Sequence, residues 1–272
     1  MKLRYYLTIL FAIIGFSVFA STVDTLQLQS SFLKKQTKFV VIKPTTSSIN
    51  PENYPVVYLL HGYSGNYATW SKIAPQLSKT ADDLKIIFVC PDGGFGSWYF
   101  DSPIDSTIQY ESYITKELVP YIDSHFPTKS EVKYRAITGL SMGGHGAMFL
   151  AIRHLDVFGA AGSTSGGVDF TPFPNNWDIK KDLGTYEEHP DRWKENTVLS
   201  QVEKLKNNQL AIIVDCGVDD FFLAVNRSLH EKLLKLKINH DYIERPGGHS
   251  NEYWSKNIDY QILFFKKYFS NN

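Results

Sequence analysis

Short apolar runs alternate with amphipathic stretches along most of the chain. Near-continuous apolar segments at Phe39 to Ile42, Val56 to Leu60 and Ile86 to Val89 are typical of strands buried on both faces. Further short strands are expected around 134–137, 158–163, 210–214 and 241–243. Strands and helices alternate after residue 50. This order predicts an α/β fold with a mostly parallel central sheet and helices on both faces.

Apolar residues at helical spacing predict the helices between these strands. The longest such pattern follows Asp105 or Ser106, either of which could cap a helix, and it places one apolar face on Tyr110, Tyr113, Ile114, Leu118 and Ile122. Other helices are expected around 70–77, from 142 through 152, over 223–236 and over 251–268. A turn is expected over residues 50–53, where Asn50 and Pro51 are adjacent.

The segment from about 166 to 204 interrupts the alternation. It is irregular and rich in prolines and tryptophans, namely Pro172, Pro174, Trp177, Pro190 and Trp193. We interpret it as a cap-like excursion over the carboxyl edge of the sheet, within a single domain over residues 21–272.

The first twenty residues have the pattern of a secretory signal peptide. Lys2 and Arg4 precede an apolar run over residues 7–19, and Ala20 ends a small-residue cleavage pattern. An uncleaved membrane anchor is the alternative, although the run is short for a spanning helix. We therefore expect a secreted or periplasmic protein with no stable membrane insertion after cleavage.

Charge and cysteine content exclude several classes. The 272 residues include 28 Lys and Arg and 28 Asp and Glu, with no basic stripe, so nucleic acid is not an expected partner. The two cysteines, Cys90 and Cys216, end apolar runs on strands that are not expected to be neighbours. We therefore expect buried free thiols rather than a disulfide. A homo-oligomer is compatible with this composition.

The segment Gly139-Leu140-Ser141-Met142-Gly143 has the pattern of a nucleophile elbow, a sharp turn between a strand and a helix that exposes a serine hydroxyl. The context agrees, because a short apolar strand precedes it and small residues follow it. A serine at such a turn indicates a hydrolase or acyl transferase that forms an acyl-enzyme.

A serine nucleophile requires a base and an acid, which follow it in the order acid, then histidine. Asp219 and Asp220 both qualify as the acid, because they follow the strand over 210–214, where ligand-facing groups cluster. Asp92 and Asp101 precede the serine and Asp215 lies at a strand end, so these three acids rank lower. His249 follows two glycines after the last short strand and is the candidate base.

The remaining histidines are expected to be structural. His145 follows the elbow and should pack beneath the nucleophile. Ordinary surface or partly buried positions are expected for His125, His154, His189, His230 and His240.

An oxyanion hole requires two backbone N–H donors. The first should be the amide of Met142, directly after the nucleophile. The second should come from the loop after the strand over 56–60, where His61 and Gly62 occur, and we expect the Tyr63 amide to supply it.

Five blocks together resemble the esterase D family of α/β-hydrolases over roughly residues 25–270. They are Leu59-Leu60-His61-Gly62-Tyr63-Ser64-Gly65-Asn66, Trp98-Tyr99-Phe100-Asp101-Ser102-Pro103, Gly139-Leu140-Ser141-Met142-Gly143-Gly144, Gly217-Val218-Asp219-Asp220 and Gly247-Gly248-His249. That family includes S-formylglutathione hydrolases, tributyrin-type esterases, feruloyl and acetyl-xylan esterases and secreted mycolyltransferases. The resemblance implies Ser141, Asp220 and His249 as the triad.

The resulting hypothesis is a secreted serine carboxylesterase that acts on short-chain or carbohydrate-linked acyl esters, without cofactor or metal. Trp98, Trp177 and Phe221 are expected in the substrate pocket. The alternatives are an acyltransferase to a sugar or lipid alcohol, an S-formylglutathione hydrolase-type thioesterase and a non-catalytic binding protein with a hydrolase fold.

Overall fold

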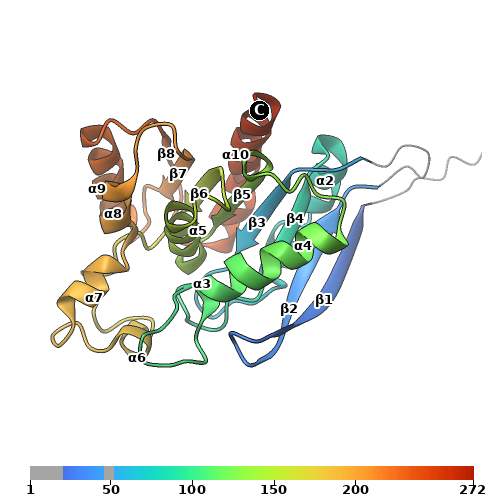
Figure 1. Cartoon of the computed structure of the whole chain (residues 1–272). Coiled ribbons are helices and arrows are strands. Elements are labelled where there is room, and N and C mark those ends of the chain that lie inside the picture. Colours follow the sequence, from blue (N-terminus) through green and yellow to red (C-terminus); the bar gives the residue numbers. More distant parts are fainter. Residues whose placement is uncertain (1–20, 46–51) are drawn as a thin grey trace, which may run out of the picture.

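A single eight-stranded sheet forms the centre of the computed structural model, which describes residues 21–45 and 52–272 (Figure 1). The expected signal peptide, and Asn50 and Pro51 of the expected turn, lie outside the described residues. The strand order is β1-β2-β4-β3-β5-β6-β7-β8. No helix in the described residues is both long enough and apolar enough to cross a membrane.

The sheet is antiparallel at one side and parallel over the rest. β1 (Thr22–Ser30) and β2 (Lys35–Lys43) form a hairpin, and β2 pairs antiparallel with β4 (Ile87–Pro91). The remaining neighbours pair in parallel. They are β3 (Val56–Leu60), β5 (Arg135–Gly139), β6 (Ala160–Thr164), β7 (Ala211–Gly217) and β8 (Asp241–Arg245). The expected mostly parallel sheet is therefore confirmed, and β1 is an additional strand whose alternating pattern the sequence analysis missed.

Helices cover both faces of the sheet, as expected. α4 (Val119–His125), α5 (Met142–Arg153) and α9 (Leu223–Lys235) share one apolar cluster. α2 (Leu77–Leu84) and α10 (Asn251–Ser270) belong to a second cluster on the opposite face. Figure 1 shows α4 and α5 in front of the sheet and α10 behind it.

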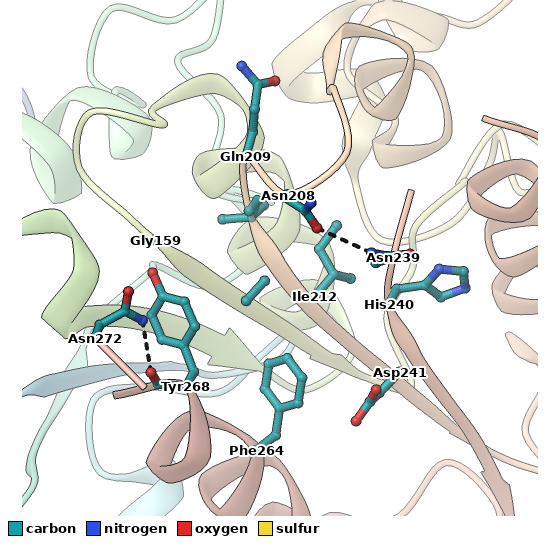
Figure 2. Close-up of a pocket in the computed structure, with 12 residues that line it drawn as sticks. Gly159, Asn208, Gln209, Ile212, Asn239, His240, Asp241, Phe264, Tyr268 and Asn272 are labelled. Atoms are coloured by element: carbon teal, nitrogen blue, oxygen red, sulfur yellow. Dashed lines mark hydrogen bonds between the residues drawn. The ribbon is translucent and has the colours of Figure 1, made fainter. Parts of the chain in front are cut away.

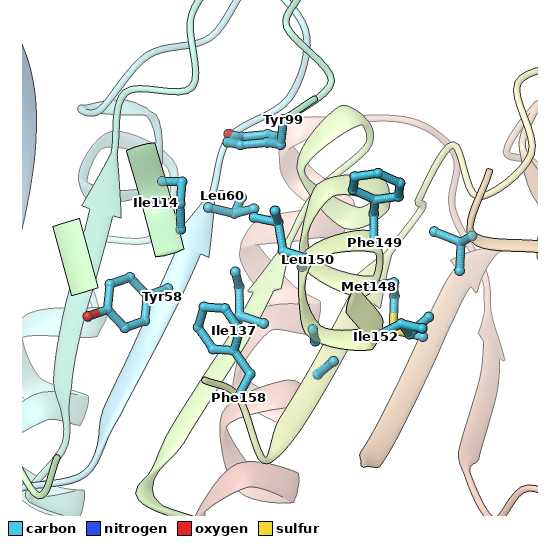
Figure 3. Close-up of a cluster of buried hydrophobic side chains, with 14 of the residues drawn as sticks. Tyr58, Leu60, Tyr99, Ile114, Ile137, Met148, Phe149, Leu150, Ile152 and Phe158 are labelled. Atoms are coloured by element: carbon cyan, nitrogen blue, oxygen red, sulfur yellow. The ribbon is translucent and has the colours of Figure 1, made fainter. Parts of the chain in front are cut away.

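Strand β3 shows why its sequence is apolar throughout. Tyr58 and Leu60 point into the first cluster, while Val57 and Leu59 point into the second, because successive strand side chains face opposite sides. Figure 3 shows Tyr58 and Leu60 on the side of the sheet that α5 covers. A strand buried on both faces has no solvated side on which polar residues would be favourable.

Two expected helices differ from the structure. The helix expected from Asp105 or Ser106 begins at Tyr110 in α3 (Tyr110–Ser112) and continues through a π-helical stretch, Tyr113–Leu118, into α4. Asp105 instead accepts a hydrogen bond from the Thr107 amide at 2.8 Å, which forms a local turn before the helix. Asp101, outside the helix, accepts the Ser112 amide at 2.9 Å and so satisfies one of the unpaired donors of the first turn.

The helix expected over 70–77 is also interrupted. It is divided into α1 (Thr69–Ile73) and α2. Pro75 disfavours a helical conformation at the residue before it, and Ala74 has φ −130° and ψ 63°.

The segment expected to be irregular, 166–204, contains short helices. They are α6 (Ile179–Leu183), α7 (Pro190–Glu195), α8 (Val198–Gln201) and the 3-10 turn Val202–Lys204. The His145 ring on α5 lies 2.8 Å from the Asn196 carbonyl oxygen, and this hydrogen bond ties the segment to the core.

Both cysteines are buried and free, in agreement with the expectation. Cys90 lies on β4 and Cys216 on β7, and β3, β5 and β6 separate these strands in the sheet. Burial raises the pKa of the Cys90 thiol to about 12, so this group remains protonated at neutral pH.

Candidate functional site

Ser141 lies at a sharp turn between β5 and α5. It has φ 55° and ψ −118°, a conformation that residues with a side chain rarely adopt. Its amide donates to the Thr164 carbonyl at 3.1 Å, which fixes the turn against the neighbouring strand. Gly143 is required by close packing, because a Cβ there would collide with the Leu60 carbonyl. The sequence therefore folds locally into the expected strand–turn–helix.

Ser141, His249 and Asp220 lie in a hydrogen-bonded row. His249 Nε2 is 2.9 Å from Ser141 Oγ, and His249 Nδ1 is 2.9 Å and 3.1 Å from the two carboxylate oxygens of Asp220. The Ser141 residue is 8% exposed and the His249 side chain 16% exposed, while the Asp220 carboxylate is fully buried. This order of groups allows a histidine to take a proton from the serine while a carboxylate orients the ring.

The structure brings Asp220, and not Asp219, to the histidine. Asp220 Oδ1 also accepts the Phe222 amide at 2.8 Å, so two donors hold the carboxylate in place. Asp219 is exposed, and its amide donates to the Gly247 carbonyl at 2.9 Å. That bond joins the loop after β7 to the loop that carries His249.

His61 anchors the loop that follows β3. Its Nε2 accepts the Gly93 amide at 2.7 Å, so the proton of the neutral ring is on Nδ1, which donates to the Gly62 carbonyl at 2.8 Å. Burial lowers the pKa of His61 and so favours this neutral form.

The residues whose amides are expected to form the oxyanion hole lie on the two loops that meet at Ser141, since Tyr63 lines the same cavity and Met142 follows Ser141 directly. Gly62 is required by close packing, because a Cβ there would lie 2.7 Å from the Leu140 side chain, so the loop before Tyr63 approaches the elbow closely. Met142 is the first residue of α5, where an N–H has no partner within the helix. Within the described residues, the amides of Ser64 and Gly65 in this loop donate to carbonyl oxygens, whereas the Tyr63 amide has no carbonyl partner.

A cavity of about 490 Å³ opens beside Ser141 and His249. Trp177 and Phe221, both expected in the pocket, line it and stack on each other with ring centroids 6.0 Å apart. Phe221 also lies 4.3 Å from the His249 ring. These two residues form an aromatic wall.

Trp98, which was also expected in the pocket, lies instead in the core. It is 1% exposed and packs behind Trp177, with ring centroids 5.7 Å apart, and against Phe170 and His145. Trp98 has a φ of 51° and Tyr99 a φ of 62°, and this unusual backbone accompanies the burial of both rings. Trp98 therefore supports the pocket wall without lining it.

Five lining residues on helices were not anticipated from the sequence. They are Thr69, Lys72 and Ile73 on α1, and Asn251 and Trp254 on the first turn of α10. The Trp254 ring packs edge-on against His249 at 4.8 Å. Because α1 follows the His61–Gly62 loop and α10 follows the His249 loop, their first turns border the same cavity. The sequence held one signal for these residues, since each helix directly follows a loop that carries a predicted site residue.

His145 and Asp215 have structural surroundings. His145 is completely buried among aromatic rings, and burial lowers its pKa to about 4. Asp215 is also completely buried and accepts hydrogen bonds from Thr164, Tyr253 and Gln261. In the part of the chain that the structure describes, neither group is hydrogen-bonded to Ser141 Oγ or to the His249 ring.

A second cavity, of about 380 Å³, lies at the other end of the sheet (Figure 2). It is formed around the amino ends of β7 and β8, including Leu210 and Asp241, and it contains no member of the Ser141 row. Within the described part of the chain, no group of three or more His, Cys, Asp or Glu side chains is placed to hold a metal ion. The cavity beside Ser141 is therefore the candidate active site.

Residues 30–265 match the family model described as "Putative esterase". The chain belongs to this esterase family. The resemblance seen in the sequence is thereby confirmed, and the family consists of carboxylesterase-type hydrolases with the α/β-hydrolase fold.

Relatives of this esterase family are similar over most of the chain. An esterase of Mycobacterium tuberculosis is 29% identical over 238 residues, which cover 77% of this chain and 51% of the relative. The chain thus spans about half the length of that relative. An acetyl esterase of Caldicellulosiruptor saccharolyticus is 25% identical over 254 residues, covering 84% of this chain and 92% of the relative.

Solved structures of esterases have the same fold. A ferulic acid esterase superimposes with a TM-score of 0.80 at 28% identity, covering 92% of this chain and 99% of that chain. An S-formylglutathione hydrolase from Agrobacterium tumefaciens superimposes with a TM-score of 0.80 at 23% identity, covering 93% and 97%. The α/β-hydrolase fold expected from the sequence is confirmed.

Proposed function

We propose that the protein is a serine carboxylesterase with Ser141 as its nucleophile. The observation that carries this proposal is the row of contacts in which His249 Nε2 lies 2.9 Å from Ser141 Oγ and His249 Nδ1 lies 2.9 Å from Asp220. Membership of the esterase family supports the same chemistry.

In the proposed acylation, His249 takes the proton of Ser141 as Oγ attacks the ester carbonyl carbon. The amides of Tyr63 and Met142 donate hydrogen bonds to the resulting oxyanion. Asp220 stabilises the imidazolium and holds its orientation. The C–O bond to the alcohol then breaks, and His249 gives its proton to the departing alkoxide. An acyl-Ser141 ester and a free alcohol result.

In deacylation, water takes the place of the alcohol. His249 takes a proton from this water, whose oxygen attacks the acyl carbon, and the bond to Ser141 Oγ breaks. His249 returns the proton to Ser141, and the carboxylic acid leaves. These steps use only groups of the protein, the ester and one water molecule.

We infer a substrate with a short or carbohydrate-linked acyl group, such as acetyl or feruloyl. The similar proteins named acetyl esterase and ferulic acid esterase support this inference. The aromatic wall of Trp177 and Phe221 offers a surface on which a flat acyl group can stack. A panel of acetylated and feruloylated oligosaccharides beside simple aliphatic esters tests it, and added alcohols in the same assay reveal any acyl transfer.

We also propose export of the protein through its first twenty residues. The charged start, the apolar run and Ala20 support cleavage after that residue. N-terminal sequencing of protein recovered outside the cytoplasm should begin at Ser21, and a chain that retains Met1 in the membrane fraction would support the anchor instead.

The direct test of the activity is hydrolysis of p-nitrophenyl acetate by the wild type and by Ser141→Ala. We expect the substitution to lower kcat by a factor on the order of 10⁴ or more, because no nucleophile remains. His145→Gln serves as a control for loss of a histidine near the elbow. Equal rates for the wild type and Ser141→Ala would overturn the proposal.

A further inference from the structure

The cavity beside Ser141 has an unbalanced charge. Among the described residues that line it, Lys72 is the only lysine or arginine, and there is no aspartate or glutamate. The cavity in Figure 2 differs, because Asp241 is its only acidic or basic lining residue apart from His240 in the described part of the chain, and the cavity lined by Lys35, Asp105 and Asp182 carries both signs. The lining beside Ser141 therefore presents a positive charge to its contents.

Lys72 is also available to a ligand. It lies exposed on α1, and its ammonium group forms no ion pair or hydrogen bond within residues 21–45 and 52–272. Some exposed lysines are paired, for example Lys79 with Asp83 and Lys256 with Glu252, whereas Lys85 and Lys235 resemble Lys72 in having no ion pair within the described residues but do not line this cavity. An unpaired ammonium at a cavity wall can hold an anionic group without first breaking an ion pair.

Two helix N-termini add to the positive potential. α5 begins directly after Ser141, and α10 begins at Asn251, which itself lines the cavity. The N-terminus of a helix carries about half a positive charge, so both helices favour negative groups at this place. Neither terminus would identify a site by itself, but both reinforce the charge of Lys72.

Carboxylates also lie next to some of the lining residues in the sequence. Asp178 is 3.0 Å from the Lys181 ammonium and Glu252 is 2.7 Å from that of Lys256, so a lysine offsets part of the negative charge of each. Asp220 accepts a hydrogen bond from His249. Within the described residues, no carboxylate forms an ion pair with Lys72.

The two walls of the cavity differ in chemistry. Trp177 and Phe221 form the aromatic wall, whereas Thr69 and Lys72 on α1 supply polar groups. A substrate with a flat apolar body and an anionic group can contact both walls while its ester carbonyl lies at Ser141.

We infer that the enzyme prefers carboxylic esters that carry an anionic group, and that Lys72 binds this group. The inference rests on the proposed esterase function of the same site. The anion can belong to the acyl part or to the alcohol part of the ester. In both cases the interaction is the same, namely a carboxylate or similar anion bound by the Lys72 ammonium group.

Two pairs of probes separate these sources. On the acyl side, mono-p-nitrophenyl terephthalate carries a para carboxylate, and p-nitrophenyl para-methylbenzoate is its neutral partner. On the alcohol side, para-acetoxybenzoate is compared with its methyl ester. The para position keeps each carboxylate away from its own ester, so intramolecular catalysis does not contribute.

Lys72→Met removes the charge and keeps an unbranched side chain, and Lys72→Glu reverses the charge. Lys79→Met is the matched control, because it removes one exposed lysine charge from the neighbouring helix outside the cavity. Thermal unfolding of all variants establishes that they are folded.

For the wild type we expect kcat/KM to be higher for the anionic member of at least one pair. Lys72→Met should lower this preference about three- to tenfold, and Lys72→Glu should reverse it, as expected for charges a few ångströms apart near a surface. Lys79→Met should retain the wild-type ratio. Raising the salt concentration from 0.05 M to 0.5 M should weaken the preference for the anionic ester, because added ions screen the attraction between Lys72 and the anionic group.

Two results would overturn the inference while the Ser141-dependent activity stands. The wild type could prefer the neutral ester of both pairs, or Lys72→Met could leave the ratio of kcat/KM between anionic and neutral esters unchanged.

A binding measurement distinguishes failure of this inference from failure of the proposed esterase function. Calorimetry on Ser141→Ala should detect terephthalate or para-hydroxybenzoate more strongly than the corresponding methyl esters, and Lys72→Met should remove the difference. If Ser141→Ala binds the carboxylates and their methyl esters equally, Lys72 does not bind the anionic group. This result would overturn the inference even if the wild type hydrolysed none of the esters.

Discussion

At the scale of single residues, the site depends on a few side chains held in unusual positions. Ser141 has a backbone conformation that is unfavourable for a non-glycine residue, and the bond from its amide to Thr164 helps to maintain it. Asp220 is held by the Phe222 amide and His249. Strained or buried polar groups of this kind are common where chemistry takes place.

Asp220→Asn tests the role of the carboxylate. Hydrogen bonding to the Asn amide would favour the wrong His249 tautomer, so we expect kcat to fall by a factor on the order of 10³ to 10⁴ with little change in KM. Steady-state hydrolysis of p-nitrophenyl acetate measures both constants. Asp219→Asn is the control, because Asp219 is exposed and the carboxylate at His249 Nδ1 is that of Asp220. A loss in Asp219→Asn as large as in Asp220→Asn would contradict the assignment.

At the scale of the elements, one buried carboxylate joins the two halves of the site. Asp215 at the carboxyl end of β7 accepts hydrogen bonds from Thr164 on β6, at 2.7 Å, and from Tyr253 on α10, at 3.1 Å. Thr164 also holds the Ser141 turn, and the Tyr253 ring packs against Gly247 in the His249 loop. We expect Asp215 to act as a positioning residue that keeps the nucleophile and the base in register.

Asp215→Asn tests this connection. The Asn amide would place a donor opposite the Gln261 Nε2 donor, which now lies 2.5 Å from the Asp215 carboxylate. We expect kcat to fall about tenfold, with KM changed by less than about twofold and the free energy of unfolding lowered by about 1–3 kcal/mol.

The double variant Asp215→Asn with Gln261→Glu supplies an acceptor in place of the opposing donor. It should recover part of kcat if the hydrogen-bond network positions the site. Recovery of stability without recovery of kcat would show that Asp215 supports the fold but does not position the site.

At the scale of the whole molecule, stability should depend on pH through groups buried at some distance from Ser141. Burial raises the pKa of Asp182, on α6, from its usual 3.8 to about 7, and the nearby Asp105 and Asp178 carboxylates add to this effect while Lys181 opposes it. Because the folded state binds the proton more tightly than the unfolded state, this group lowers stability as pH rises from about 4 through about 7.

Asp182→Asn should remove that dependence, since an amide resembles the protonated acid and does not ionise. We expect the free energy of unfolding of the variant, relative to the wild type, to rise between pH 5 and pH 8 by on the order of 2 kcal/mol. Urea unfolding at both pH values measures this difference. A difference that is the same at both values would show that the Asp182 carboxylate is already ionised at pH 5.

Much of the fold could be predicted from the sequence, because strands and helices follow local patterns of apolar residues. The apolar run of β3 and the spacing of Tyr110, Tyr113 and Ile114 require burial, whichever element packs against them. Element starts were less accurate where a distant side chain decided them. Asp101, eleven residues before Ser112, accepts a hydrogen bond from the Ser112 amide in the first turn of the helix that begins at Tyr110. No local pattern distinguishes Asp101 from Asp105.

The site divides in the same way. The sequence by itself determined the fold and the resemblance to the esterase family, and it predicted a serine hydrolase site because Ser141, the Asp219–Asp220 pair and His249 occur in the order and surroundings that this chemistry requires. The resemblance to the family favoured Asp220 over Asp219, and the structure places it at His249. Only the tertiary structure decided that Trp98 is buried behind Trp177, and that Lys72 and Trp254 border the cavity. These outcomes depend on how the loops after β3, β7 and β8 meet at one edge of the sheet. Packing, and not the local sequence pattern, sets the distances between segments that are far apart in the chain.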